Sequence, residues 1–282
     1  MADHHHHHHH AGDEQLDQVF AKFRTLLDEV PTEKTLIEGE LSDRTKPKRL
    51  PADDVMDDIV AELRKLVPAI AEAPGEKIFI PKTEGFRGYT KKNTIHIDDF
   101  LYPTDEDIDM LCEEGELSRS YCGDCGSRNV QDLNFVSHSA SLSQLKYIFS
   151  EDGVGNLKGK KVVDIGSRLG AVLYAGYYYS EAEKLIGVEK NEWFTNLQKN
   201  FVKKRKLDDR IEIIGGDILQ LSQVLTDADV IVMNNVFEFF VNSPKLMSNL
   251  WASIKAAANK KGCILVTIPS IETSFADAGV SF

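Results

Sequence analysis

The sequence lacks a long hydrophobic run, a recognisable signal peptide and any excess of positive charge. No apolar stretch approaches about 18 residues, so we predict no transmembrane helix. Lysine and arginine total 33 against 45 aspartates and glutamates, and the net charge of −12 argues against broad binding to nucleic acid or to anionic membranes. Cysteine is scarce. The four present form no evident disulfide framework, which fits a reducing cytoplasmic or nuclear compartment.

What is present is the composition of an ordinary globular protein. Hydrophobic residues make up 42% and charged residues 28% of the 282 positions, enough for one large domain or a domain with an appendage. Residues 1–12 contain seven consecutive histidines and are interpreted as an expression tag. We therefore expect an N-terminal helical and lid region over 13–150 and a core over 151–282.

The stretch from Lys161 to Gly170 is the most informative part of the core. Residues 161–165 are rich in β-branched apolar side chains, as expected of a strand covered on both faces. Gly166 allows a sharp turn and close approach of the backbone to a ligand, and Gly170 allows the next helix to lie close to the sheet. Free N–H groups at such a turn suit a polar or anionic ligand.

A second strand, over 184–188, ends in Glu189, which lies 23 residues after Gly166. A carboxylate there is placed to accept hydrogen bonds from a ribose diol. The turn has the pattern D-x-G-x-x-x-G rather than G-x-G-x-x-G, which favours S-adenosylmethionine over a dinucleotide. Asp164, directly before the turn, is placed to face the ammonium group of that cofactor. The predicted cofactor-binding residues of this region are Asp164, Gly166, Ser167, Arg168, Gly170 and Glu189.

Four pieces of the core carry a family resemblance: VVDIGSRLG, GVEKN, GGDIL and VIVMNNVFEFF. With them, residues 157–270 resemble a class I S-adenosylmethionine-dependent methyltransferase and, more weakly, the non-SET histone-lysine methyltransferase type within that class. The resemblance implies S-adenosylmethionine as cofactor and S-adenosylhomocysteine as product. Arg168 departs from it, because the class usually has glycine there. The arginine would either close part of the cofactor cradle or contact the cofactor carboxylate.

The resemblance also implies roles for residues that follow the third and fourth strands. It places Asp217 near the adenine, accepting from the exocyclic amine, with Ile218 packed on the ring. It places Asn234 and Asn235 beside the methyl acceptor, where an amide accepts from an amine N–H and orients the nitrogen lone pair. These two asparagines are the predicted catalytic residues, and Asn234 is also a predicted cofactor contact.

Strand and helix patterns alternate regularly through the core. Strands are predicted over 161–165, 184–188, 211–214, 229–233 and 262–268, and helices over 169–180, 192–206 and 243–258. This predicts an α/β fold, a doubly wound, mostly parallel Rossmann-like methyltransferase sheet of strand order 3-2-1-4-5 with a helical N-terminal appendage. The site is then expected at the carboxyl ends of the strands.

Two amphipathic helices are predicted ahead of the core, over 13–30 and 52–72, separated by a polar connector over 31–51. A short strand is predicted over 77–80. Packing within the chain is our main interpretation of the apolar stripes of the two helices. The alternative is a surface for dimerisation or for another partner.

Residues 98–116 carry nine acids and no base. Thr104 is predicted to cap a helix over 105–114, whose first turn is acidic, as the helix dipole favours. The simple interpretation is a solvated helix face. The functional alternative is an acidic rim that attracts a basic substrate.

Cys122 and Cys125 have the spacing of half a zinc site. Cys112 and His138 are the nearest further candidates, but their spacing matches no standard pattern, so we assign no metal. A redox dithiol is disfavoured because no thioredoxin-like unit surrounds the pair. The main interpretation is a tight turn in a lid over the cofactor, followed by a short helix from about Ser141.

The leading functional hypothesis is methyl transfer from S-adenosylmethionine to nitrogen on a basic protein or a small amine. Nucleic acid is disfavoured, because Asn234-Asn235 differs from the D/N-P-P-Y pattern of adenine methyltransferases, and no membrane role is expected. The alternative is a non-catalytic adaptor with the same fold that binds partners through its N-terminal helices. Arg168 and the lack of a closing strand pair after Ile268 motivate this alternative.

Overall fold

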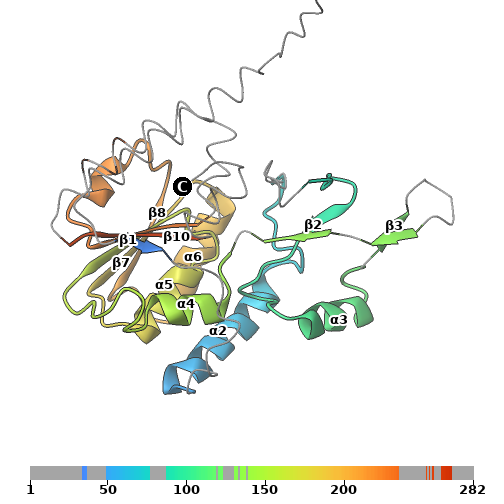
Figure 1. Ribbon diagram of the computed structural model, residues 1–282, viewed down its shortest axis with the longest axis horizontal. Coiled ribbons are helices and arrows are strands. Elements are labelled where there is room, and N and C mark those ends of the chain that lie inside the picture. Colours follow the sequence, from blue (N-terminus) through green and yellow to red (C-terminus); the bar gives the residue numbers. More distant parts are fainter. Residues whose placement is uncertain are drawn as a thin grey trace, which may run out of the picture.

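The computed structural model describes the chain in several stretches (Figure 1). The described residues are 34–36, 49–76, 87–118, 120–122, 130–132, 134–137, 139–234 and 262–268, together with positions 252, 254 and 256. The helix predicted over 13–30 and the strand predicted over 77–80 lie outside these stretches.

A six-stranded sheet, seen at the left in Figure 1, forms the centre of the core. Its strands are β1 (Lys34–Leu36), β6 (Lys161–Ile165), β7 (Lys184–Glu189), β8 (Ile211–Gly215), β9 (Val230–Asn234) and β10 (Ile264–Ile268). Their order is β1-β10-β9-β6-β7-β8, and every pairing is parallel. The predicted Rossmann-like order 3-2-1-4-5 is confirmed, with each predicted strand within two residues of its observed bounds.

The outermost strand, β1, corrects the expectation of a plain connector over 31–51. Residues Lys34–Leu36 pair in parallel with Leu265–Thr267 of β10. Three residues are too few for a period-2 pattern to stand out, so a strand this short and polar is not distinguishable from a connector by pattern.

The inner strands are buried, as predicted from their apolar, β-branched sequences. Val162 and Val163 of β6 are fully buried, and so are the four residues Val230–Met233 of β9. Parallel strands are normally covered on both faces, which explains the continuous apolar runs.

Helices α5 (Ala171–Tyr179) and α6 (Glu192–Lys204) connect the strands β6, β7 and β8, and the 3-10 helix η2 (Ser222–Leu225) precedes β9. The ring of Tyr174 on α5 lies 5.0 Å from that of Phe201 on α6, so the two helices pack together. Positions 252, 254 and 256 are helical, as predicted for 243–258, and the other residues of that range lie outside the described part.

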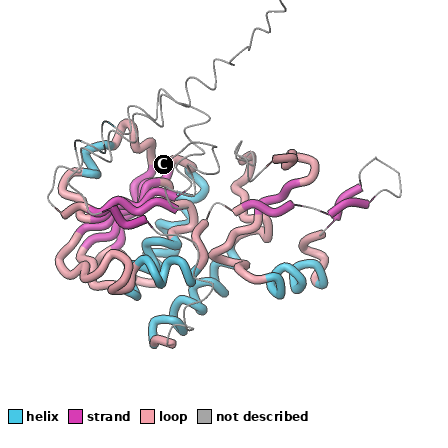
Figure 2. Tube along the Cα trace, viewed as in Figure 1, coloured by secondary structure: helices cyan, strands magenta, loops and turns pink. Residues whose placement is uncertain are grey.

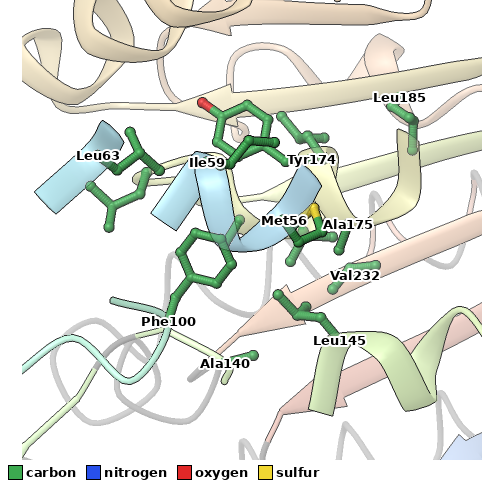
Figure 3. Packing of buried hydrophobic residues seen from close by; sticks show 14 of the residues in the cluster. Met56, Ile59, Leu63, Phe100, Ala140, Leu145, Tyr174, Ala175, Leu185 and Val232 are labelled. Carbon is green, nitrogen blue, oxygen red and sulfur yellow. The ribbon is translucent and has the colours of Figure 1, made fainter. Parts of the chain in front are cut away.

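Helix α2 (Pro51–Leu66) is an integral part of the core. It ends before Pro68, six residues earlier than predicted. Figure 3 shows Met56, Ile59 and Leu63 among core side chains that include Tyr174, and all four residues are fully buried. Packing within the chain, the main interpretation of this helix, is confirmed for its buried face.

Two carboxylates of α2 fasten it to the core helices. Asp53 accepts hydrogen bonds from Lys146 (2.8 Å) and from the hydroxyl of Tyr179 (2.6 Å). Glu62 forms ion pairs with Lys204 (2.8 Å) and Arg205 (2.6 Å) on α6. These bonds orient the helix as well as anchor it, because each carboxylate meets two partners.

Short strands and two helices form the rest of the described structure, much of it set apart from the sheet at the right of Figure 1 and Figure 2. Strands β2 (Thr94–His96) and β5 (Asn134–Val136) pair in parallel, and β3 (Ser120–Cys122) pairs with β4 (Val130–Asp132) in the antiparallel sense. None of these four strands was predicted. Helices α3 (Asp105–Glu113) and α4 (Leu142–Ile148) were predicted. Thr104 caps α3 as expected, and Ser141 caps α4.

Among the described helices none combines the length and apolarity needed to cross a membrane.

Candidate active site

The turn after β6 has the backbone that its glycines predict. Gly166 and Gly170 adopt φ angles of 76° and 89°, which side-chain-bearing residues seldom adopt. The N–H groups of Gly166 and Ser167 both donate to the carbonyl of Val188, at 2.8 and 3.1 Å. The turn is thereby tied to β7, and a Cβ at Gly166 would meet nothing within 4 Å. The space beside Gly166 is therefore open to a ligand.

Gly170 is required by its own helix rather than by the sheet. It is the N-cap of α5, and a Cβ there would lie 2.5 Å from the ring of Tyr174. The predicted approach of the helix to the sheet is therefore not the reason for this glycine, since the atoms that a Cβ would meet belong to a side chain one turn along the same helix.

Glu189 ends β7 and binds the glycine turn through one carboxylate oxygen and the start of α6 through the other. Oε1 accepts from the N–H of Arg168 at 2.8 Å, and Oε2 accepts from the N–H of Asn191 at 2.9 Å. The side chain is 9% exposed, and this burial raises the pKa of Glu189 against the opposing effect of the two N–H donors. Each oxygen retains a second lone pair, so the predicted ribose contact stays compatible with this geometry.

Asp164 and Ser167 present buried polar atoms with no protein partner. The residues are 2% and 5% exposed, and Asp164 Oδ1 and Ser167 Oγ make no hydrogen bond within the described structure. Burial, reinforced by the charge of Glu189, raises the pKa of Asp164 to about 8. Nε of Arg168 is a third buried atom of this turn without a hydrogen-bond partner among the described residues. Buried polar atoms are normally satisfied, so their presence beside one open turn indicates a place for a polar ligand.

Gly187, which follows Ile186 on β7, makes room for this cluster. It pairs with Asp164 across the sheet, and a Cβ there would lie 2.8 Å from Ser167 Oγ and 2.6 Å from Leu173 Cδ1. Gly187 lies within the GVEKN piece, but the sequence alone assigns it no role.

Arg168 is held by the chain's own N-terminal segment. It has a φ of 47°, and its Nη2 donates to the carbonyl of Ala71 and to Glu76 Oε1, both at 2.7 Å. The guanidinium also lies over the ring of Phe194, with its carbon 4.3 Å from the ring centroid. Neither predicted role of Arg168 involved these partners, which become neighbours only through the tertiary fold.

Asp98 corrects the expectation of a continuous acidic rim over 98–116. It is fully buried and accepts from Ser139 Oγ and from the N–H groups of Phe100 and Leu101. Burial raises the pKa of Asp98, and the charge of Arg168 acts in the opposite direction. Asp98 is therefore part of the structural framework near Arg168, not of the solvated surface.

Asp107 also has a structural role. It completes the N-terminal cap of α3 with Thr104, and it forms a 3.1 Å ion pair with Arg64 of α2. The acids exposed on α3 are Asp105, Glu106, Asp109 and Glu113.

The predicted adenine side lies at the ends of β7 and β8. The N–H of Gly216 donates to the Glu189 carbonyl at 2.8 Å, and Asp217 Oδ1 accepts from the N–H of Leu219 at 3.0 Å. Asp217 Oδ2 lies 3.9 Å from the ammonium of Lys190, and Ile218 is half-buried nearby in sequence. Asp217 and Ile218 thus follow β8 directly, beside the end of β7 that carries Glu189.

Asn234 is half-buried at the end of β9, in register with Ile268 of β10. Asn235, with Phe237 and Phe239 of the same motif, lies outside the described residues. Cys125 and His138 do too, whereas Cys122 is placed on β3 by its backbone. Within the described part of the chain, no cluster of three or more His, Cys, Asp or Glu residues is arranged to hold a metal ion.

Comparison with known proteins reveals similarity in structure alone. No protein-family model and no curated protein sequence matches the chain. Solved structures that it resembles include Arabidopsis thaliana protein arginine methyltransferase 10, at 23% identity over 32% of this chain and 25% of that chain, with a TM-score of 0.28. The match thus spans about a quarter of the plant enzyme.

Two further similar structures come from other organisms. The precorrin 8w decarboxylase of Methanobacterium thermoautotrophicum is 18% identical over 49% of this chain and 68% of that chain, with a TM-score of 0.38. The Trypanosoma brucei PRMT1 enzyme–prozyme complex, solved with AdoHcy, is 24% identical over 32% of this chain and 27% of that chain, with a TM-score of 0.28. Similarity at this level concerns the fold.

Proposed function

We propose that the protein is an S-adenosylmethionine-dependent methyltransferase that modifies nitrogen on a basic protein or a small amine. The observation that carries this proposal is the buried, unpartnered carboxyl of Asp164 at the open glycine turn. An ionised carboxylate in that position is costly unless a cation meets it. The cofactor carries both an ammonium and a sulfonium group, so it supplies the missing charge.

The charge balance around the turn supports a cationic ligand. Asp164 and Glu189 are buried there, and Asp98 lies close enough to Arg168 to interact with it electrostatically. The cation among these side chains is the guanidinium of Arg168, which already pairs with Glu76. The carboxyl groups outnumber the cation, and burial raises the pKa of all three, so a positively charged ligand would favour their ionised forms where an anionic one would oppose them.

The residues present fit the cofactor in the following roles. Asp164 would accept from the ammonium group, Ser167 Oγ would bind the same amino-acid portion, and Glu189 would accept from the ribose hydroxyls. Asp217 would accept from the adenine amine, with Ile218 against the ring. When bound, the cofactor supplies an electrophilic methyl group, so the protein's task is alignment and exclusion of water.

Asn234 would orient the acceptor nitrogen, because its amide oxygen can accept an amine N–H. A lysine acceptor must first lose a proton, and a dry site favours this loss by lowering the amine pKa. The exposed acids of α3 support a basic acceptor, since opposite charges speed up association.

A non-catalytic adaptor is the second candidate, and the contacts of Arg168 favour it. Arg168 occupies the position at which class I methyltransferases, which the sequence resembles, usually have glycine. Its ion pair with Glu76 binds the turn to the N-terminal region. In that case the glycine turn would stabilise the fold and would take no part in methyl transfer.

Calorimetry and a methylation screen separate the two functions. We expect S-adenosylhomocysteine to bind the wild-type protein and to raise its thermal midpoint, because it binds the native state only. We then expect labelled methyl groups to reach a basic protein or amine. Cofactor binding without transfer to any acceptor in such a screen would favour the adaptor, and a lack of binding would refute the methyltransferase proposal.

A further inference from the structure

The segment Val67–Glu76, here called the strap, links α2 to the region before β2. It contains two prolines and a glycine, yet Val67, Ala71 and Ala73 are buried, at 5%, 0% and 4% exposed. The N–H of Ala71 donates to the carbonyl of Pro68 at 2.7 Å, and that of Glu76 to the carbonyl of Ala73 at 3.0 Å. The strap therefore follows a defined path although it is neither helix nor strand.

The strap contacts both β2 and the glycine turn. Its Ile70 carbonyl lies 2.6 Å from Nδ1 of His96 on β2, which is 1% exposed. Its Ala71 carbonyl and Glu76 carboxylate receive Arg168 Nη2 from the cofactor turn. A rearrangement of the strap would therefore be felt at the turn and at β2 together.

Arg168 joins the strap to the glycine turn, and its contacts with Ala71 and Glu76 are here called the clasp. Its N–H donates to Glu189 while its side chain reaches the strap and stacks on Phe194. The side chain is 16% exposed and that of Glu76 is 19% exposed, so the ion pair is shielded from solvent. A non-glycine residue at positive φ is unfavourable, and this contact set offsets that cost.

We propose that Arg168 is a positioning residue that couples closure of the strap to binding at the glycine turn. When the clasp is made, the strap and β2 are held against the turn. When it is lost, the turn keeps its glycines and its carboxylates but loses its cover. The coupling rests on the proposed function, because its ligand is the methyl donor or its product.

The chain offers a matched control in Arg205. Its guanidinium also pairs with a glutamate of the N-terminal region, Glu62, and lies over a phenylalanine ring, that of Phe201. The Arg205 side chain is 22% exposed, close to the value for Arg168. It joins the end of α6 to α2 and, within the described part of the chain, forms no hydrogen bond or ion pair with the strap. Its loss should therefore weaken the fold without loosening the cover of the turn.

The test combines amide hydrogen exchange with calorimetry using S-adenosylhomocysteine. Arg168→Lys, Arg168→Gly and Glu76→Gln should each speed exchange in the strap and weaken binding by about tenfold or more, the scale of one charged hydrogen bond. The double variant Arg168→Lys/Glu76→Gln should bind S-adenosylhomocysteine no more weakly than the worse single variant, because both substitutions affect the same contact, that between Arg168 and Glu76. Arg205→Lys should leave strap exchange and affinity unchanged.

Two results would overturn the coupling. One is strap exchange at the wild-type rate in Arg168→Lys and Glu76→Gln. The other is a double variant whose affinity loss is the product of the two single losses. If the wild-type protein binds no S-adenosylhomocysteine but the strap still loosens in both single variants, the clasp stands and the proposed function fails. The two ideas are thus tested separately.

Discussion

Arg168 and Ala71, 97 residues apart in the sequence, are joined by a 2.7 Å hydrogen bond from Nη2 of the arginine to the carbonyl of the alanine. Both residues have left-handed backbones, with φ angles of 47° and 54°. Such conformations cost about 1 kcal/mol or more for residues with a side chain, and they persist where surrounding contacts impose them. The two strained positions thus support each other at the border between the strap and the glycine turn.

Gly187 should tolerate no side chain. Gly187→Ala would place a Cβ within 3 Å of Leu173 and Ser167, so we expect a loss of roughly 1–3 kcal/mol in unfolding free energy from overpacking. Gly159→Ala is the control, since a Cβ there meets nothing and only the positive φ is unfavourable. Denaturant titration compares the two. A loss below about 1 kcal/mol in Gly187→Ala would show that the strand has room to yield.

Helix α2 should unfold with the core rather than as an appendage. Ile59 is fully buried in the core cluster, so Ile59→Ala should cost about 2–5 kcal/mol. Leu66→Ala on the same helix removes a side chain from a residue that is 46% exposed and should change stability by less than about 0.5 kcal/mol. A single cooperative transition in calorimetry is expected for both. A separate low-temperature transition in Ile59→Ala would contradict one shared core.

Much of this core was predictable because its cause is local. The strands β6, β7 and β9 are runs of apolar residues, and the cap Thr104 is a short-range signal. The four short strands β2 to β5 lack such runs, and β1 is too short to show one. The partners of Arg168 could not be predicted, because Ala71, Glu76 and Phe194 reach it only through the tertiary fold.

The burial of Asp98 was missed for a related reason. In the sequence it opens a run of acids, and charge density alone suggests solvent exposure. The structure satisfies its carboxylate with a hydroxyl and two backbone N–H groups, which allows full burial. Its partner Ser139 lies 41 residues away in the sequence, so no local sequence pattern predicts the contact.

Asp53 should stabilise the fold at neutral pH and cease to do so in acid. Burial alone would raise the pKa of Asp53, but the bonds from Leu50, Lys146 and Tyr179 outweigh it and hold the value at about 2, below the ordinary 3.8. A lowered pKa means that stability is present above pH 4 and is lost as the pH falls towards 2. Asp53→Asn should therefore be less stable by roughly 1–3 kcal/mol at pH 7, the range for a hydrogen-bonded charge.

The difference in stability between the two proteins should then shrink below about pH 4 as the wild-type carboxylate is protonated. Urea unfolding of both proteins at several pH values measures this. A difference that is the same at pH 7 and at the lowest pH reached would show that the bonds to Asp53 do not depend on its charge.

The exposed acids of α3 should speed capture of a basic acceptor. In the triple variant Asp105→Asn, Glu106→Gln, Asp109→Asn, we expect a higher KM and a weaker salt dependence, because exposed charges are screened over about 8 Å at physiological salt. Asp107 is left intact because it caps the helix and pairs with Arg64. A variant neutralised at Glu151, Asp152 and Glu183 controls for net charge. The measurement is steady-state kinetics at several salt concentrations with the acceptor found by the methylation screen. Equal KM and equal salt dependence in the two triple variants would show that the acids of α3 are only solvated and do not attract the acceptor.

The raised pKa of Asp164 also predicts how the stability of the fold depends on pH. Burial and the charge of Glu189 raise its pKa to about 8, so the folded protein holds a proton that the unfolded chain releases above its ordinary value of 3.8. Stability should therefore fall as the pH rises from about 4 to 8, and this fall should be smaller in Asp164→Asn. Thermal unfolding across that range checks the sign; an equal fall in both proteins would place the proton elsewhere.

The central claim is that Asp164 receives the ammonium group of the methyl donor or its product. Its most direct test is calorimetry with S-adenosylhomocysteine at pH 7, in buffers of different ionisation enthalpy. With a pKa raised to about 8, Asp164 is mostly protonated in the free protein at pH 7, so binding of an ammonium group should release most of one proton, and the release should decline as the pH rises through 8. Asp164→Asn should bind at least about tenfold more weakly and release none, whereas Asp53→Asn should match the wild type. Wild-type binding with heats that do not depend on the buffer, and equal affinity in Asp164→Asn, would contradict the account.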